Sequence, residues 1–68
     1  MRKFEIGKRY SEGGMTIEVE DRTEKTITFL VILHAGHPNE RVRETKKKRI
    51  QNSRNGEAIW MSPYEIEA

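Results

Sequence analysis

The chain lacks cysteine entirely and has almost no long hydrophobic runs. Without cysteine it can form neither disulfide bonds nor thiolate–metal sites, so a reducing cytoplasm is the default compartment. The longest apolar run, from Phe29 to Leu33, is too short to cross a bilayer. The N-terminus reads Met-Arg-Lys-Phe-Glu and has no apolar stretch typical of a signal peptide. We therefore expect a cytoplasmic protein with no membrane partner.

Recognisable catalytic and cofactor motifs are also missing. Ser11, Ser53 and Ser62 lie among turn residues, without the context of an activated nucleophile. No glycine-rich loop has the spacing of a phosphate cradle. Glu18 and Glu20 share one strand face, but acid–base catalysis needs carboxylates in a cleft, which so short a chain can hardly enclose. We expect no enzyme and no cofactor.

One short segment resembles a metal site. His34 and His37 are followed by Glu40, and two imidazoles with a carboxylate could hold zinc or nickel. Structural zinc usually takes four protein ligands, however, and a loop with Gly36 and Pro38 does not hold three ligands rigidly. We expect no metal site, but two exposed histidines.

Apolar residues alternate with polar ones along most of the chain, which is typical of strands with one buried face. Glycine pairs, Asn-Gly and Ser-Pro separate the alternating segments. The strands predicted in this way are 4–10, 15–20, 26–34, 57–61 and 64–66. We predict one all-β domain over residues 1–68, either a small SH3-like barrel or a strongly bent antiparallel sheet of five to six short strands. An OB-like barrel fits less well, because no clear helix separates the third and fourth strands.

The central strand, 26–34, is apolar on both faces. Ile27, Phe29 and Val31 share one face, while Leu30 and Ile32 point to the other. In one interpretation the strand bends across a small barrel, so that the fold covers both faces. In the other, Leu30 and Ile32 form an oligomer or partner interface, which would make the protein a monomer or a weak homodimer.

Residues 40–51 permit two interpretations. Their Glu, Arg, Lys and Gln residues are good helix formers, and Asn39 could cap a helix. Val42 and Ile50 are the only apolar residues, however, so a helix would have no buried face. We favour a long, splayed edge strand or the arm of a bulged hairpin. Lysines on such an edge also prevent aggregation, which would explain the basic run without any ligand.

Positive charge is concentrated between residues 41 and 54, whereas the rest of the chain is acidic overall. In a strand, Arg41, Arg43, Lys47 and Arg49 would share one face, at about 6.7 Å spacing. Such a row could follow the phosphates of a nucleic acid without reading its sequence. The alternatives are an acidic protein surface and a merely solvated edge. The candidate contact residues are Arg41, Arg43, Lys46, Lys47, Lys48, Arg49 and Arg54.

Single-stranded nucleic acid is usually held by stacking as well as by charge. Trp60 and Tyr64 are the candidate stacking residues, with Tyr10 as a third. Trp60 lies on the strand that returns after the basic segment, so it could sit beside the cations. Because the chain has few large apolar residues, we favour a core position for Tyr10 and Trp60.

Four spaced pieces of the sequence carry a resemblance. They are Phe4-x-x-Gly7-x-x-Tyr10, Val19-x-x-Arg22-Thr23-x-Lys25-x-Ile27-x-Phe29, Arg49-Ile50 and Gly56-Glu57-x-Ile59. In these the chain resembles small uncharacterised proteins of bacterial phages and mobile elements. The resemblance implies an all-β fold of the SH3-like barrel type, with no catalytic residue. It also implies a role in binding nucleic acid, or in binding and blocking a host protein.

From these patterns we expect a non-enzymatic module that binds RNA or DNA with low specificity through a basic strand. The alternative is a phage or mobile-element protein that inhibits a host protein such as a defence nuclease, in the manner of an anti-CRISPR protein. A third hypothesis is a structural protein that oligomerises through Leu30 and Ile32.

Overall fold

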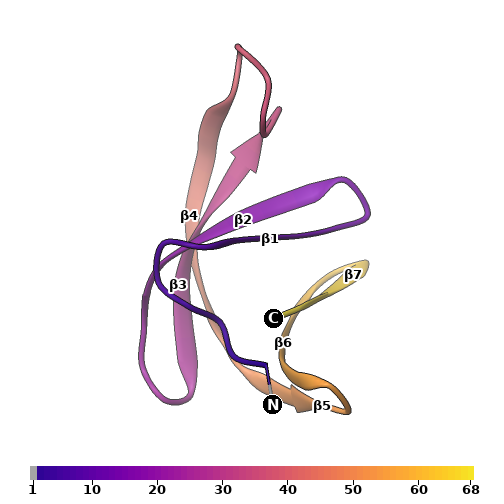
Figure 1. Cartoon of the computed structure of the whole chain (residues 1–68). Coiled ribbons are helices and arrows are strands. Elements are labelled where there is room, and N and C mark those ends of the chain that lie inside the picture. Colours follow the sequence, from indigo (N-terminus) through magenta and orange to yellow (C-terminus); the bar gives the residue numbers. More distant parts are fainter. Residues whose placement is uncertain (1) are drawn as a thin grey trace.

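The structure, a computed structural model, describes residues 2–68. Strands β1 (Arg9–Glu12), β2 (Met15–Arg22), β3 (Thr26–Leu33) and β4 (Arg41–Arg49) form an antiparallel sheet in this order. Strands β5 (Gln51–Ser53), β6 (Gly56–Met61) and β7 (Tyr64–Glu67) form a second antiparallel sheet (Figure 1). The all-β prediction is confirmed. None of the described residues belongs to a helix that could cross a membrane.

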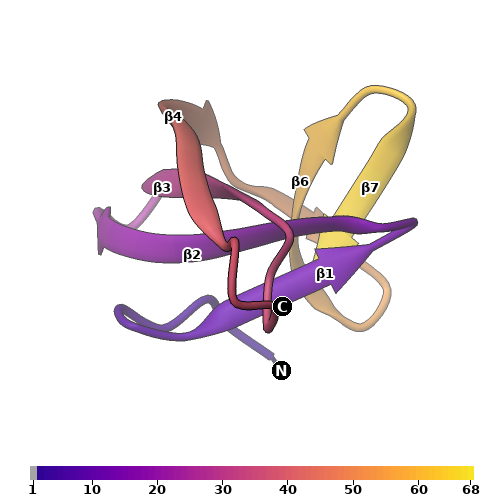
Figure 2. The same ribbon diagram turned by 90° about the horizontal axis from the view of Figure 1, so that it is seen from above.

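The two sheets are joined through Ile50, the one residue between β4 and β5. The strand predicted over residues 40–51 therefore exists, but it passes from one sheet into the other. On the opposite side, β1 contacts β7. The β6–β7 hairpin consequently lies against the β1–β2 side of the larger sheet, as the two views show (Figures 1 and 2). This arrangement is consistent with the predicted small barrel-like or strongly bent antiparallel fold, but residues 2–68 form seven short strands in two sheets instead of five to six.

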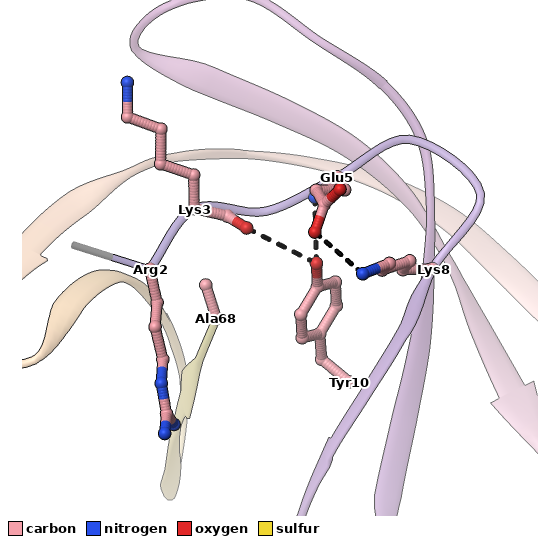
Figure 3. Close-up of a pocket in the computed structure, with 6 residues that line it drawn as sticks. All are labelled: Arg2, Lys3, Glu5, Lys8, Tyr10 and Ala68. Atoms are coloured by element: carbon pink, nitrogen blue, oxygen red, sulfur yellow. Dashed lines mark hydrogen bonds and ion pairs between the residues drawn. The ribbon is translucent and has the colours of Figure 1, made fainter.

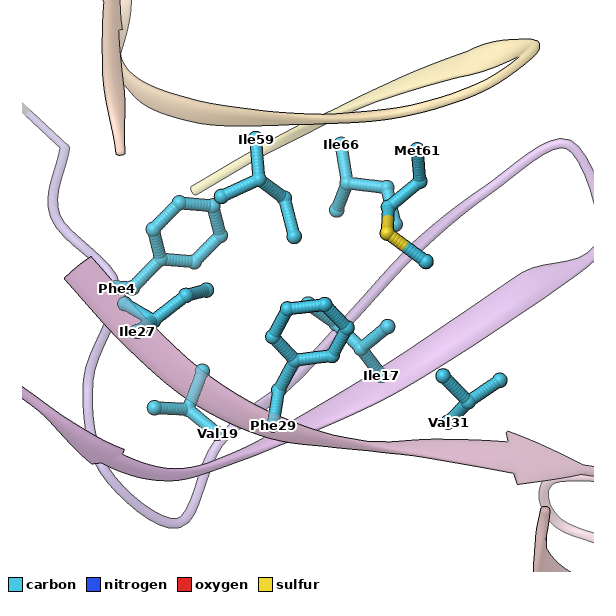
Figure 4. Close-up of a cluster of buried hydrophobic side chains, with 9 residues drawn as sticks. All are labelled: Phe4, Ile17, Val19, Ile27, Phe29, Val31, Ile59, Met61 and Ile66. Atoms are coloured by element: carbon cyan, nitrogen blue, oxygen red, sulfur yellow. The ribbon is translucent and has the colours of Figure 1, made fainter. Parts of the chain in front are cut away.

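The core lies between the sheets and follows the period-two pattern of the strands. Alternate residues of β2 and β3 point towards β6 and β7, whose own alternate residues point back (Figure 4). Full burial of one such side chain stabilises the fold by about 1.5–3 kcal/mol. The buried cluster consists of Phe4, Ile17, Val19, Ile27, Phe29, Val31, Ile59, Met61 and Ile66.

The strand predicted over residues 4–10 is wrong over residues 4–8. Phe4 is buried as expected, but Ile6 is 59% exposed, and β1 begins only at Arg9. The chain reverses at Gly7, where φ is +89°, and the Gly7 N–H donates to the carbonyl oxygen of Val19 at 2.8 Å. Glycine adopts this conformation without the steric penalty of a Cβ atom. The turn breaks the alternation and leaves Ile6 in solvent.

The residues before this turn pair with β6 instead of β1. Arg2 forms a parallel bridge with Gly56, and the Glu57 N–H donates to the Arg2 carbonyl oxygen at 2.9 Å. Gly56 has a φ of +138°, and a Cβ atom there would overlap the Arg2 backbone. The missing side chain of Gly56 therefore lets the N-terminal segment reach the second sheet.

The second apolar face of β3 is largely covered. Leu30 is half-buried, and Ile32 is only 6% exposed. Both lie on the outer side of the larger sheet, where Leu30 is opposite Glu18 and Ile32 is opposite Val42. Of the two interpretations, the structure favours the one in which the fold itself covers this face. An oligomer contact through Leu30 and Ile32 stays a prediction.

Candidate nucleic-acid interface

Strand β4 carries most of the candidate contact residues at the end of the larger sheet. Among residues 2–68 it pairs only with β3, so no described strand pairs with its other edge. Long flexible cations suit such an edge, because their charge stays in water and discourages pairing with another chain. The burial pattern agrees, since only Glu44 and Lys46 of the nine β4 residues are half-buried and the others are exposed.

A β-bulge divides the cations of β4 between the two sides of the sheet. Val31 is opposite Glu44, but the next residue, Ile32, is opposite Val42, so Arg43 is an extra residue on β4. Beyond a bulge the alternation of side chains changes phase. The prediction that Arg41, Arg43, Lys47 and Arg49 share one face is therefore wrong.

The register shows which cation lies on which side. Lys46 is opposite Phe29 and Lys48 is opposite Ile27, so both lysines lie on the core-facing side of the sheet. Arg41, opposite Leu33 beyond the bulge, lies on this side too. The cations on the outer side are Lys47 and Arg49, which are opposite Thr28 and Thr26.

Arg43, Lys46 and Lys48 line a groove at the edge of the core, whereas Arg41 does not. Two hollows of about 280 and 230 Å³ adjoin here and share Met15, Val31 and Arg43 as lining residues. Lys46, Lys48 and Met61 line the first hollow, and Tyr64 lines the second. We call the two hollows together the β4 groove. Its main lining residues are Met15, Val31, Arg43, Lys46, Lys48 and Tyr64.

The charges of β4 are largely uncommitted to internal ion pairs. Glu44 is the one carboxylate that lines the β4 groove, with its oxygens 3.4 Å from Arg43 Nε and 3.7 Å from Lys46 Nζ. Three cations against one carboxylate leave the groove positive. Across residues 2–68, the candidate residues that pair with no carboxylate within 4 Å are Arg41, Lys47, Lys48, Arg49 and Arg54.

Of the two proposed stacking residues, only Tyr64 lines the β4 groove. Its half-buried ring packs against Gly13, where a Cβ atom would overlap the ring. Trp60 is 49% exposed on the side of β6 that faces away from the core, where it is opposite Glu65. The prediction of a core position for Trp60 is therefore wrong. Arg54 is exposed in the turn between β5 and β6, away from the residues that line the groove.

Tyr10 has the expected core position. Its ring lies edge-on to that of Phe4, with ring centroids 4.9 Å apart. Its hydroxyl accepts a hydrogen bond from the Glu5 N–H at 2.8 Å. Tyr10 is therefore half-buried and packs against the edge of the core, with its hydroxyl hydrogen-bonded to the N-terminal segment.

A separate hollow of about 630 Å³ lies beside the N-terminal segment (Figure 3). It is lined by Lys3, Glu5, Lys8 and Tyr10, together with Arg2 and Ala68 at its rim. Lys8 Nζ donates to Glu5 Oε2 at 2.8 Å, so the carboxylate of Glu5 neutralises one of the cations that line this hollow. This hollow offers exposed lysines away from β4 that serve as controls for mutagenesis.

Sequence reasoning missed the ion pair between half-buried Arg22 and buried Glu57. Arg22 Nη1 and Nη2 donate to the two Glu57 oxygens at 2.6 and 2.9 Å, and the Phe4 N–H donates to Glu57 Oε1 at 2.9 Å. Arg22 also donates to the Phe4 carbonyl oxygen at 2.8 Å. The network ties β2 and β6 to the N-terminal segment. The only sign of this pair in the sequence was the position of Glu57 beside the apolar residues of β6.

A second missed network holds the connection between β3 and β4. Glu40 accepts two hydrogen bonds from Arg9, at 2.6 and 2.8 Å, and one from the Gly36 N–H at 2.9 Å. Arg9 also donates to Glu18 at 2.9 Å. The Arg9 hydrogen bonds, and then that of Gly36, lower the pKa of Glu40 to about 2.

The contacts of Glu40 also show whether the segment with His34, His37 and Glu40 could bind a metal ion. Glu40 is engaged by Arg9 and is not directed to His34 or His37 as a third ligand. Within residues 2–68, no three His, Asp or Glu side chains are grouped so that they could hold a metal ion. The Glu40 carboxylate instead fixes the loop.

Comparisons with protein-family models, with curated proteins and with solved structures gave no match to this chain. The resemblance to small phage proteins therefore stays a prediction from the sequence. The geometry and charge of β4 are the observations that bear on function.

Proposed function

We propose that this protein is a non-enzymatic, cytoplasmic module that binds nucleic acid with low sequence specificity through β4. The uncommitted positive charge of β4 is the observation that carries the proposal. Arg9 and Arg22 are each held by hydrogen bonds to carboxylates, whereas Lys47, Lys48 and Arg49 pair with none. A polyanion that neutralises such cations releases condensed counterions, which favours binding.

Low specificity follows from the type of contact. Lysine side chains meet phosphates as flexible point charges, and phosphate contacts carry no direct information about base sequence. The cations of β4 also follow one extended strand, which suits the repeating backbone of a nucleic acid better than one compact anion.

Fluorescence anisotropy with labelled single-stranded RNA, single-stranded DNA and duplex, measured over a series of salt concentrations, tests this function. We expect saturable binding whose log K falls linearly with log salt. A triple variant with Lys46, Lys47 and Lys48 changed to Gln should lose most of the affinity. The matched control changes three exposed lysines outside β4, Lys3, Lys8 and Lys25, to Gln and should bind far more tightly than the β4 variant. Flat traces at low salt would refute the proposal.

The free edge of β4 supports a second candidate function. An exposed edge strand can accept a strand from another protein, and its lysines would favour an acidic partner. In this role the chain would be a phage or mobile-element protein that inhibits a host protein such as a defence nuclease. Titration of purified nucleases should then show loss of activity at stoichiometric protein, without any binding of bare nucleic acid. Full nuclease activity throughout the panel would count against this candidate.

A further inference from the structure

The two sides of β4 offer a nucleic acid very different surroundings. On the outer side, Lys47 and Arg49 project from an open sheet surface next to Thr28 and Thr26. On the core-facing side, Lys46 and Lys48 face Met61 across a hollow of about 280 Å³. Only the core-facing set therefore belongs to a concave site with two walls.

The β4 groove combines charge with an apolar floor. Met15 and Val31 line both of its hollows, and Tyr64 lines the second hollow together with Arg43. A base can contact such a surface only with its flat face, which is covered by neighbouring bases within a duplex. The chemistry of the groove thus matches unstacked bases.

The spacing of the cations matches an extended strand. Lys46 and Lys48 are two residues apart on one side of β4, which separates them by about 6.7 Å. This is close to the distance between successive phosphates in an extended single strand. Arg43, which directly precedes Glu44 in β4, supplies a third cation in the same groove. Three phosphate contacts predict that log K falls with log salt at a slope of about −2 for a single strand.

Glu44 opposes an anion in the same groove. Its carboxylate is half-buried between Arg43 and Lys46, where it neutralises part of their charge. A phosphate that approaches these two cations must compete with it. Replacement of Glu44 by the uncharged isostere Gln should therefore strengthen binding.

We infer that the β4 groove takes a short single-stranded segment, with its phosphates on Arg43, Lys46 and Lys48 and a base against Tyr64. This inference rests on the proposed function and narrows it to one side of β4 and to single strands. Duplex is excluded because its bases are not free to enter the groove.

Two double variants of the same strand test the inference. Lys46→Gln with Lys48→Gln removes two charges from the groove, and Lys47→Gln with Arg49→Gln removes two from the outer side. Anisotropy with single-stranded oligonucleotides should show a loss of about tenfold or more for the groove variant and a salt slope reduced to about −0.7. The outer variant should lose less than about threefold and keep the slope, because its charges act only at a distance. Wild-type protein should bind duplex at least about tenfold more weakly than single strands.

The outcomes separate the two proposals. Equal losses for the two double variants, or duplex binding as tight as that of single strands, would overturn the groove assignment while leaving nucleic-acid binding by β4 intact. No binding of any nucleic acid by wild-type protein would overturn the proposed function itself.

As a gain-of-function test, Glu44→Gln should tighten single-strand binding about threefold or more, because a like charge beside the phosphates is removed. Unchanged or weaker binding of this variant would contradict the assignment.

Discussion

Glu57 is the one buried charged side chain among residues 2–68, with 7% of its surface exposed. The hydrogen bonds from Arg22 are the largest cause that lowers its pKa, and the Phe4 N–H also contributes. Because the pKa in the folded state lies below the ordinary value of 4.5, the ionised carboxylate stabilises the fold above that pH. This stabilisation is lost as the pH falls through the lowered pKa.

Arg22→Met should be among the most destabilising single changes in the chain. It leaves the buried Glu57 carboxylate without its counter-ion, which typically costs about 3–5 kcal/mol. Arg22→Lys keeps the charge but loses the two-pronged contact, so it should destabilise less. Urea unfolding at neutral pH, followed by circular dichroism, measures the free energy of unfolding. A loss below about 1 kcal/mol for Arg22→Met would contradict the role of this pair.

Gly13 and Gly14 offer a matched test of how Tyr64 is held. Both have positive φ, +58° and +85°, so alanine is strained at either position. A Cβ atom at Gly13 would also overlap the Tyr64 ring, whereas one at Gly14 would meet nothing within 4 Å. Gly13→Ala should therefore reduce the free energy of unfolding by more than about 1 kcal/mol, and by more than Gly14→Ala does. Equal losses in thermal or urea unfolding would show that Tyr64 does not pack against this turn.

At the scale of elements, the connection from β3 to β4 is held by one side chain. β3 ends at Leu33, and His34 adopts the left-handed conformation, with a φ of +56°, that turns the chain out of the sheet. Glu40 then returns the loop towards Arg9 on β1, at the opposite end of the strand order. This seven-residue loop without regular secondary structure is thereby positioned by the hydrogen bonds of one exposed carboxylate rather than by burial.

Glu40→Gln should loosen this loop without unfolding the sheets. The Gly36 amide, which donates to Glu40, should exchange with solvent faster, while the amides of β2 and β3 keep their protection. Because the pKa of Glu40 is lowered from 4.5 to about 2, the wild-type contact should be complete above pH 4.5 and lost as the pH falls through about 2. Hydrogen exchange of Gly36 measured by NMR checks both statements. Unchanged exchange in the variant would show that Glu40 does not hold the loop.

At the scale of the whole molecule, stability depends on a thin core between two small sheets. Ile59 of β6 is fully buried opposite Ile66 of β7, and both pack against residues of β2 and β3. A domain of this size buries a smaller fraction of its surface than a larger one does, so each buried methyl group carries a larger share of the stability.

Ile59→Val should lower the free energy of unfolding by about 0.5–1.5 kcal/mol, because one buried methyl group is lost. Ile6→Val makes the same chemical change at a side chain that is 59% exposed and should stay within about 0.5 kcal/mol of wild type. Thermal unfolding of the two variants, recorded side by side, measures the difference. Equal effects would mean that Ile59 is not packed between the sheets.

Much of the fold could be predicted from local patterns. Period-two alternation located β2, β3, β6 and β7 to within two residues at either end, because a half-buried strand requires that pattern. The lack of a buried face correctly favoured an edge strand over a helix for β4. The alternation failed at Ile6, where the turn at Gly7 moves the side chain into solvent. The core position of Trp60, inferred from the small number of large apolar residues, was also wrong, because Trp60 lies on the outer side of β6 between buried Ile59 and Met61.

The candidate site could be predicted only in part. The amino-acid sequence by itself determined the strands and a positively charged edge, because alternation and charge depend on residues close together in the chain. Only the tertiary structure decided that Arg43 is a bulge, that Lys46 and Lys48 line a groove with Tyr64, and that Arg22 meets Glu57. The physical reason is that these features depend on register and packing between strands. A one-residue shift in pairing reverses the side on which every following side chain lies.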